Sequence, residues 1–149
     1  MLSLPLPFAG RSARPRAESA CVLTSIGIDI IEIGRIRDAL RRRPELAARL
    51  FTADERAYCD RKADPAPHYA ARFAAKEATA KALGRWLRWQ DVEVRRDPSG
   101  RPSIGLSGEA AQLGQASQGG RLLVSLSHSR DYAVACVVLV PPQESDRPA

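Results

Sequence analysis

The segment RFAAKEATAKALG, residues 72–84, is rich in alanine but carries Lys76, Glu77 and Lys81 near its centre. Alanine and lysine are strong helix formers, and a glycine after the last apolar residue commonly ends a helix, so we expect a helix that stops at Gly84. Glu77 and Lys81 share one face of this helix, in the order that favours an ion pair. The pattern is typical of a solvated surface pair, but small alanine side chains would also let a second backbone or a ligand come close.

The composition of the chain limits its function classes. With 149 residues, 44% hydrophobic and 27% charged, the chain is long enough for one soluble domain with a core. It contains no run of about eighteen apolar residues, so we expect no membrane-spanning segment. The net charge of +6 indicates an acidic partner, which could be nucleic acid, a phosphate-rich substrate or an acidic protein.

The cysteines indicate a reducing compartment. Cys21, Cys59 and Cys136 are odd in number, scattered, and without the spacing of metal ligands. We therefore expect free thiols and a cytoplasmic location.

The two ends of the chain differ from its middle. Residues 1–21 are rich in proline and arginine, and their apolar start is too short and too interrupted by proline for a secretory signal. We expect a disordered extension there, with an organelle transit peptide as an open alternative, and a disordered tail over residues 141–149. The folded domain is expected to span residues 22–140.

The first half of this domain predicts one strand followed by helices. The β-branched run CVLTSIGIDIIEI is typical of a strand, and GRIRDALRRRPELAARL of a helix with an apolar face opposite its arginines. Thr52 and Glu55 have the spacing of a capping box that opens another helix. A loop containing Pro65 and Pro67 is expected before the alanine-rich helix.

The second half predicts two antiparallel hairpins. DVEV and SIGL are expected as strands joined by the tight turn RRDPSGRP. After a short helix over SGEAAQLGQASQ, the runs LLVSLSH and YAVACVVLV are expected to pair through SRD. The sequence thus predicts an α+β fold, an antiparallel sheet with helices packed on one face.

Asp29 lies in the apolar run IGIDII, where an unpaired charge is costly. It needs a backbone amide, a basic side chain or a metal as its partner. Glu77, among alanines, is a second acid of the same kind. Two such carboxylates could hold one hard divalent ion together with water, if the fold brings them together.

Five segments of the chain occur in a characteristic order: GIDIIEIGRI, FTADERAYC, RFAAKEATAKALG, DVEVRRDPSGRPSIGLSG and SLSHSRDYAVACVV. Together they closely resemble holo-acyl-carrier-protein synthase, the small bacterial family of 4'-phosphopantetheinyl transferases. The resemblance spans most of residues 22–140.

This resemblance implies the 4'-phosphopantetheinyl transferase fold and a magnesium-dependent enzyme of lipid metabolism. Members of the family transfer the 4'-phosphopantetheine arm of coenzyme A to a serine of an apo acyl carrier protein and release adenosine 3',5'-bisphosphate. Asp29 and Glu77 match the aspartate and glutamate that hold Mg²⁺ in the family. Larger relatives tend to carry another acid two residues after the aspartate, where this chain has Ile31, as in the small bacterial type.

The resemblance also assigns catalytic, binding and docking roles to individual residues. Glu77 and Lys81 are expected as the catalytic residues, and Lys81, His128 and Arg72 as the coenzyme A-binding residues. Acyl carrier protein is expected to dock on the first helix, through Arg35 and then Arg42. Small members of the family are homotrimers with coenzyme A between adjacent subunits, and the RRDPSGRP turn is a candidate for the neighbour's contribution.

Two alternatives stay open. A basic nucleic-acid-binding domain without enzymatic activity would explain the charge, but it leaves Asp29 and Glu77 unexplained, and the chain has no recognised nucleic-acid module. A metal-dependent coenzyme A phosphohydrolase would use the same site. We expect neither nucleic acid nor a membrane as a partner. The sequence leaves open which carrier protein is modified and which group is the general base.

Overall fold

The computed structural model describes residues 25–116 and 120–142. The extension expected over residues 1–21 lies outside the described residues. So does the tail expected over residues 141–149, except for its first two residues.

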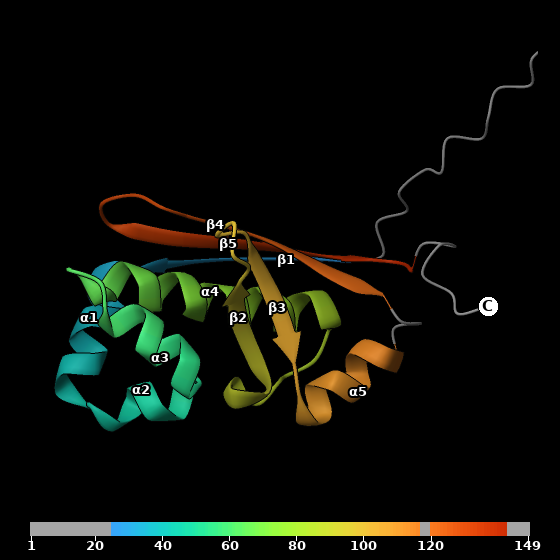
Figure 1. Ribbon diagram of the computed structural model, residues 1–149, viewed down its shortest axis with the longest axis horizontal. Helices are drawn as coiled ribbons and strands as arrows, with labels where there is room; N and C mark the ends of the chain where they lie inside the picture. The colour runs from blue at the N-terminus through green and yellow to red at the C-terminus, as the bar shows by residue number, and fades with distance from the viewer. Residues whose placement is uncertain (1–24, 117–119, 143–149) are drawn as a thin grey trace, which may run out of the picture.

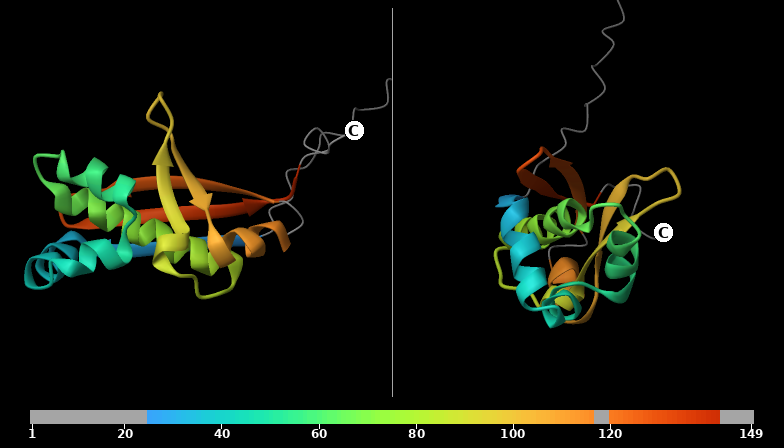
Figure 2. Two further views of the ribbon diagram at one scale, coloured as in Figure 1. Left: turned by 60° about the horizontal axis from the view of Figure 1, so that its bottom comes forward. Right: turned by 90° about the vertical axis from the view of Figure 1, so that its left-hand side faces the viewer.

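Three long strands form an antiparallel sheet, and one long helix packs across one of its faces (Figure 1). The central strand is β5 (Tyr132–Val140), with β1 (Ser25–Glu32) on one side and β4 (Arg121–His128) on the other. The helix is α4 (Pro65–Leu83), which is the alanine-rich segment. The remaining elements lie on the same side of the sheet as α4 (Figure 2).

Those remaining elements form two groups. Three short helices lie together at one end of α4: α1 (Ile33–Arg42), α2 (Glu45–Leu50) and α3 (Ala53–Asp60). A two-stranded hairpin of β2 (Val92–Arg96) and β3 (Pro102–Leu106) lies beside α4, and its tip projects beyond the body (Figure 2). The 3-10 turn η1 (Trp89–Asp91) precedes this hairpin and α5 (Gly108–Ala116) follows it. The predicted α+β fold with antiparallel strands and helices on one face is confirmed.

Small side chains explain how closely α4 approaches the sheet. Ala71, Ala74, Ala78 and Ala82 of α4 are all buried, and they pack in one core with the alanines of β5. On β1, a Cβ built on Gly27 would overlap the carbonyl oxygen of Ala78. A glycine on the strand and alanines on the helix therefore let two backbones come nearly into contact, as the alanine pattern allows.

Prolines changed two of the predicted boundaries. The helix expected over GRIRDALRRRPELAARL is two helices, because Arg43 precedes Pro44 and residues before proline disfavour helical geometry. The loop expected around Pro65 and Pro67 is wrong, because α4 already begins at Pro65. Proline suits the first turn of a helix, where no N–H partner is needed, and the Asp64 side chain caps that turn by accepting from Ala66 N.

The capping box at the start of α3 is confirmed. The Thr52 hydroxyl accepts from Glu55 N at 3.3 Å, and Thr52 N donates to the Glu55 carboxylate at 3.0 Å.

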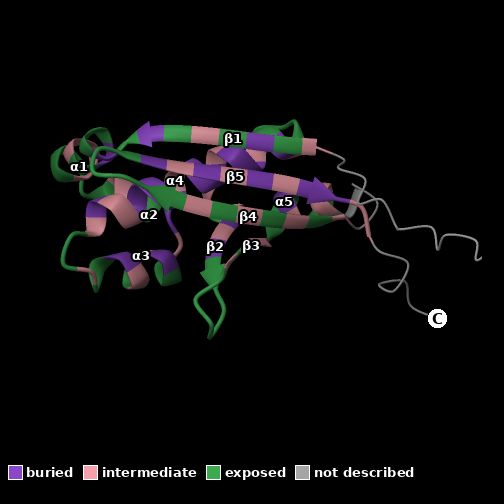
Figure 3. Cartoon of the chain, turned by 90° about the horizontal axis from the view of Figure 1, so that it is seen from above, coloured by how far each residue is buried: buried purple, intermediate pink, exposed green. Residues whose placement is uncertain are grey.

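Exposed residues recur along β1 and β4 of the main sheet (Figure 3), and several of those on its other face are apolar. On β1, Ile26, Ile28 and Ile30 are 49%, 54% and 65% exposed, and Tyr132 of β5 and Leu123 of β4 are also exposed. No described element covers this face. Within the described ranges, no helix is long and apolar enough to cross a membrane.

Candidate active site

A pocket of about 670 Å³ opens between β1, the α1–α2 pair and α4. This volume is in the range of small-molecule sites. Its polar end holds Asp29 from β1 and Glu77 and Lys81 from α4, with Arg35 of α1 also in its wall. Residues Glu77 and Lys81 share the pocket face of α4 because they are one helical turn apart.

Lys81 forms its ion pair with Asp29. Its Nζ lies 2.8 Å from Asp29 Oδ1 and also donates to the carbonyl of Ile28 at 2.9 Å. The lysine side chain is 51% exposed and the aspartate side chain 17%. The pair therefore joins α4 to β1 across the pocket, whereas the sequence pattern suggested a local pair between Glu77 and Lys81.

The Asp29 and Glu77 carboxylates converge. Burial raises the pKa of the Glu77 carboxyl above its ordinary value, the negative charge of Asp29 raises it further, and Lys81 lowers it. Two carboxylates that repel one another at a pocket wall attract a cation between them.

This donor set fits magnesium. Mg²⁺ is a hard cation that is commonly held by one or two protein carboxylates, with water and substrate phosphates completing its octahedron. Asp29 and Glu77 offer two carboxylates beside an open cavity. Among the described residues there is no cluster of three or more His, Cys, Asp or Glu side chains, so a metal ion held here would have these two carboxylates as protein ligands and room for substrate oxygens.

The other end of the same pocket is apolar. It is lined by side chains from α1, α2 and α4, namely Ile36, Ala39, Leu46, Leu50 and Phe73. Arg42 lies just beyond, on a smaller hollow that shares Ala39 and Leu46 with the pocket. A molecule bound here would meet charge at one end and a hydrophobic wall at the other.

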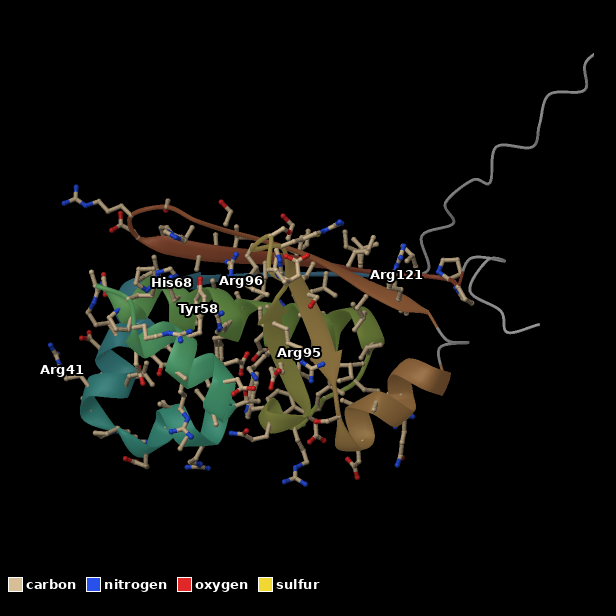
Figure 4. The ribbon with its side chains drawn as sticks, viewed as in Figure 1. Arg41, Tyr58, His68, Arg95, Arg96 and Arg121 are labelled. Atoms are coloured by element: carbon tan, nitrogen blue, oxygen red, sulfur yellow. The ribbon has the colours of Figure 1, made fainter. Side chains whose placement is uncertain are left out.

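A second, basic pocket lies between α3, α4 and β2, with Arg72 of α4 in its wall. Although Arg72 is only 2% exposed, its Nε has no hydrogen-bond partner among the described residues. Its guanidinium lies over the Tyr58 ring at 4.0 Å, and Nη1 donates to the His68 carbonyl at 3.3 Å. Figure 4 shows Tyr58, His68 and Arg96 close together at this place.

His128, at the end of β4, lies near the basic pocket, because its ring packs against His68, which in turn packs against Tyr58 of the pocket wall. Its ring centroid lies 6.0 Å from that of His68, and its Nδ1 lies 3.4 Å from the Ser129 carbonyl oxygen. Burial lowers the pKa of His68, and the positive charges of Lys62 and Arg72 lower it further. The positive field that disfavours a charged His68 would favour a bound anion such as phosphate.

Residues 25–137 match the family model of the 4'-phosphopantetheinyl transferase superfamily. The chain belongs to this superfamily. It is 50% identical over 121 residues to a holo-[acyl-carrier-protein] synthase from Syntrophotalea carbinolica, a match that covers 78% of this chain and 94% of that protein. The predicted family is confirmed, and the chain is an enzyme of the phosphopantetheinyl transferase class.

Solved structures of the superfamily have the same fold. A holo-(acyl-carrier-protein) synthase from Bacillus anthracis, in complex with CoA (3',5'-ADP), is 35% identical with a TM-score of 0.66, covering 80% of this chain and 98% of that one. A holo-ACP-synthase from Plasmodium yoelii is 26% identical with a TM-score of 0.72, covering 82% of this chain and 98% of that one. Neither the nucleic-acid-binding nor the phosphohydrolase alternative gains support from these matches.

The transferase fold separates the predicted site residues into two groups. Asp29, Glu77 and Lys81 come together in the first pocket, with Arg35 in its wall. Arg72 lines the basic pocket instead, and His128 lies near that pocket, against the ring of His68. Arg72 and Glu77 are five residues apart on one helix, so their side chains leave the axis about 140° apart. The predicted coenzyme A-binding residues therefore occupy two flanks of α4.

Sequence reasoning missed the buried pair beside this transferase site. Lys76 Nζ lies 2.8 Å from Glu55 Oε2, and both side chains are fully buried. Lys76 also donates to the carbonyl of Trp89 at 2.7 Å and to that of Val92, while Glu55 Oε1 accepts from Val94 N at 3.0 Å. One sequence signal could have predicted this pair. Lys76 lies among small apolar residues of the helix, and a lysine on a buried helix face needs an acidic partner.

Proposed function

We propose that this chain transfers the 4'-phosphopantetheine group of coenzyme A to a serine of an apo acyl carrier protein, in a magnesium-dependent reaction that releases adenosine 3',5'-bisphosphate. The observation that carries the proposal is the convergence of Asp29 and Glu77 beside Lys81 in one open pocket. The superfamily match and the coenzyme A complex of a relative support it.

Asp29 and Glu77 are the residues that would hold Mg²⁺. When bound, the ion neutralises negative charge on the pyrophosphate of coenzyme A and so favours attack at phosphorus. The two carboxylates come from different elements, and the close contact between Gly27 and α4 sets their separation.

Lys81 would supply positive charge to the phosphates. Its half-exposed ammonium is held at the pocket by Asp29 and the Ile28 carbonyl, so it can donate to a phosphate oxygen without moving far. The serine oxygen forms a new bond to the β-phosphorus and its proton passes to solvent, while the bond from that phosphorus to the bridging oxygen breaks. Negative charge then grows on the departing nucleotide, where a fixed cation is most useful.

The basic pocket would bind a phosphate at the nucleotide end of coenzyme A. Arg72 has an unpartnered buried Nε, and Arg96 and His128 add donors nearby. The pocket that contains Asp29 and Glu77, here called the carboxylate pocket, and the basic pocket occupy different flanks of α4. We therefore propose that one coenzyme A contacts the carboxylate pocket of one copy and the basic pocket of the next.

A homotrimer would supply those neighbouring copies. The exposed isoleucines of β1 form an apolar face that no described element covers, and a second copy could cover it. The projecting tip of the β2–β3 hairpin, which contains the RRDPSGRP turn, is suited to reach a neighbour. We also propose a cytoplasmic location, where coenzyme A and carrier proteins meet.

Carrier-protein docking is proposed on α1. Arg35 is exposed in the wall of the carboxylate pocket and Arg42 lies along the same side, whereas Arg37 and Arg41 form ion pairs with Asp64 and Asp38. An acidic carrier protein steered to Arg35 would place its serine near Asp29 and Glu77.

The test is intact-mass analysis of an apo acyl carrier protein incubated with this protein, coenzyme A and Mg²⁺. We expect a mass gain of one phosphopantetheine, absent without the enzyme, without Mg²⁺, and with Glu77→Gln. No gain with several carrier proteins, or the same gain without Mg²⁺, would contradict the proposal.

A further inference from the structure

The segment between α4 and β2 presents an exposed tryptophan beside two arginines. Trp86 is 73% exposed, and Arg85 and Arg88 on either side of it are exposed as well. We call Arg85, Trp86, Arg88 and Trp89 the tryptophan ledge. Single exposed apolar residues are ordinary on proteins, so the way the ledge is held matters more than its exposure.

The ledge is held in place at both of its ends. At its start, Gly84 adopts a left-handed conformation that ends α4, and Arg85 N donates to the Ala80 carbonyl at 3.1 Å. Leu87, between the two arginines, is buried in a second apolar cluster with Val92. The alternation of Leu87 inward with Trp86 outward fixes which side chains face the solvent.

At its other end, the ledge is anchored by the buried pair. Lys76 Nζ donates to the carbonyl of Trp89, and Gln90 Nε2 donates to the carbonyl of Ala48 in α2 at 2.6 Å. The segment lies between α2 and α5 at the lower side of Figure 1. A tryptophan on a segment this well fixed loses little conformational entropy when a partner covers it.

An aromatic stack connects the ledge to the carboxylate pocket. The Trp86 ring meets the Trp89 ring edge-on at 5.2 Å, and Trp89 stacks on Phe73 with centroids 5.1 Å apart. Phe73 itself lines the apolar end of the pocket. The hydrophobic wall of the pocket thus continues through three rings to the surface.

The charge of the ledge selects an acidic partner. Neither Arg85 nor Arg88 forms an ion pair with any described residue. Tryptophan and arginine are the residue types that most often carry the binding energy of protein interfaces. An acidic protein surface with an apolar centre would satisfy both.

We propose that the tryptophan ledge is a second contact surface for the acyl carrier protein, linked to the pocket through Phe73 and separate from Arg35 of α1. This inference rests on the proposed function. A stable protein complex buries about 800 Å² on each partner, far more than the arginines of one short helix provide. A carrier protein that delivers a serine into the pocket would approach this area by contacting the ledge as well as α1.

Steady-state kinetics with carrier protein and coenzyme A varied separately test the ledge. We expect Trp86→Ala to raise the KM for carrier protein at least about fivefold, with the KM for coenzyme A unchanged and Trp86→Phe close to wild type. Arg85→Ala and Arg88→Ala should each raise the same KM, whereas Arg121→Ala, at the far end of β4 (Figure 4), should not. An unchanged KM for carrier protein in Trp86→Ala overturns the inference and leaves the proposed function standing. If wild type modifies no carrier protein, both fail.

Acrylamide quenching of tryptophan fluorescence gives a reading without turnover. In a Glu77→Gln background, apo carrier protein should reduce quenching, and the reduction should be lost when Trp86→Phe is added. Protection by short duplex DNA but not by carrier protein would overturn the inference in favour of nucleic acid. Protection that grows with the concentration of the enzyme alone would overturn it in favour of a second copy.

Discussion

Two acid–lysine pairs lie on either side of α4, and they differ in how many of their hydrogen-bonding groups have partners within the protein. Lys76 and Glu55 are fully buried, and the lysine has three acceptors while the acid accepts from two backbone amides as well as from the lysine. Lys81 and Asp29 have a similar separation of 2.8 Å, but Lys81 is half-exposed and Glu77 lies beside them without a cationic partner within ion-pair distance among the described residues.

The difference shows which pair can exchange partners. A buried pair with all its hydrogen bonds made is costly to break and has nothing left to offer a ligand. An open pair beside a second carboxylate can release one partner to bind a metal or a phosphate. Lys76 and Glu77 are neighbours in sequence, yet helix geometry sends one into the core and the other into the pocket.

The largest effect should come from breaking the buried pair. Lys76→Met leaves Glu55 buried without its cation, so we expect the free energy of unfolding to fall by about 3–5 kcal/mol. Lys81→Met, the same chemical change in the open pair, should cost less than about 1 kcal/mol because that pair is half-exposed. Urea unfolding of both variants at one protein concentration measures the difference. Equal losses would remove the distinction between the two pairs.

For enzyme activity we expect the opposite order, with a larger loss from a change in the open pocket than from a change in the buried pair. Glu77→Gln should lower kcat/KM at least about 100-fold, because it removes one of the two carboxylates proposed to hold the metal, and the free energy of unfolding should stay close to that of wild type. Glu55→Gln serves as the matched change at the buried pair, and it should lower stability while the fraction that stays folded keeps its activity. Full activity of Glu77→Gln in the mass assay would contradict the metal assignment.

A smaller effect is expected at Arg35, where we propose that the carrier protein docks beside the open pocket. Arg35→Glu should raise the KM for carrier protein about tenfold at low salt, because charge at this rim steers encounter, and the effect should shrink as salt screens the charge. The KM for coenzyme A should change little. Equal changes in both KM values would argue against docking through Arg35.

The smallest effect should separate the role of Glu55 in the capping box of α3 from its role in the ion pair with Lys76. Thr52→Ala removes the hydroxyl that caps α3 but leaves the ion pair intact, so we expect a loss of about 1 kcal/mol in the free energy of unfolding and no change in activity. A loss as large as that of Lys76→Met would mean that the cap and the ion pair act as one unit.

The helices and strands were predicted well because each depends on residues that are close together in the sequence. The β-branched run around Asp29, the capping box at Thr52 and the two hairpins each depend on a few neighbouring residues, and the structure has all of them. Pro65 was misread because proline is equally typical of a loop and of the first turn of a helix.

The candidate site was predicted by residue type but not by contact. Asp29 and Glu77 were singled out as acids in apolar surroundings, and the structure brings them together. The partner of Lys81 is Asp29, 52 residues away, and that of Lys76 is Glu55; neither contact has a local pattern. The separation of Arg72 from Glu77, in contrast, follows from helix geometry and could have been read from their spacing.

Gly27 has no chemical role, yet it controls the spacing of two chemical groups. Since even one methyl group there would overlap the backbone of α4, Gly27→Ala must shift the helix that carries Glu77 away from the strand that carries Asp29. In a complete substitution library selected for enzyme function, position 27 should therefore tolerate as little as the carboxylates themselves. A protein engineer who seeks to change the proposed metal site would have more freedom at its rim than at this glycine.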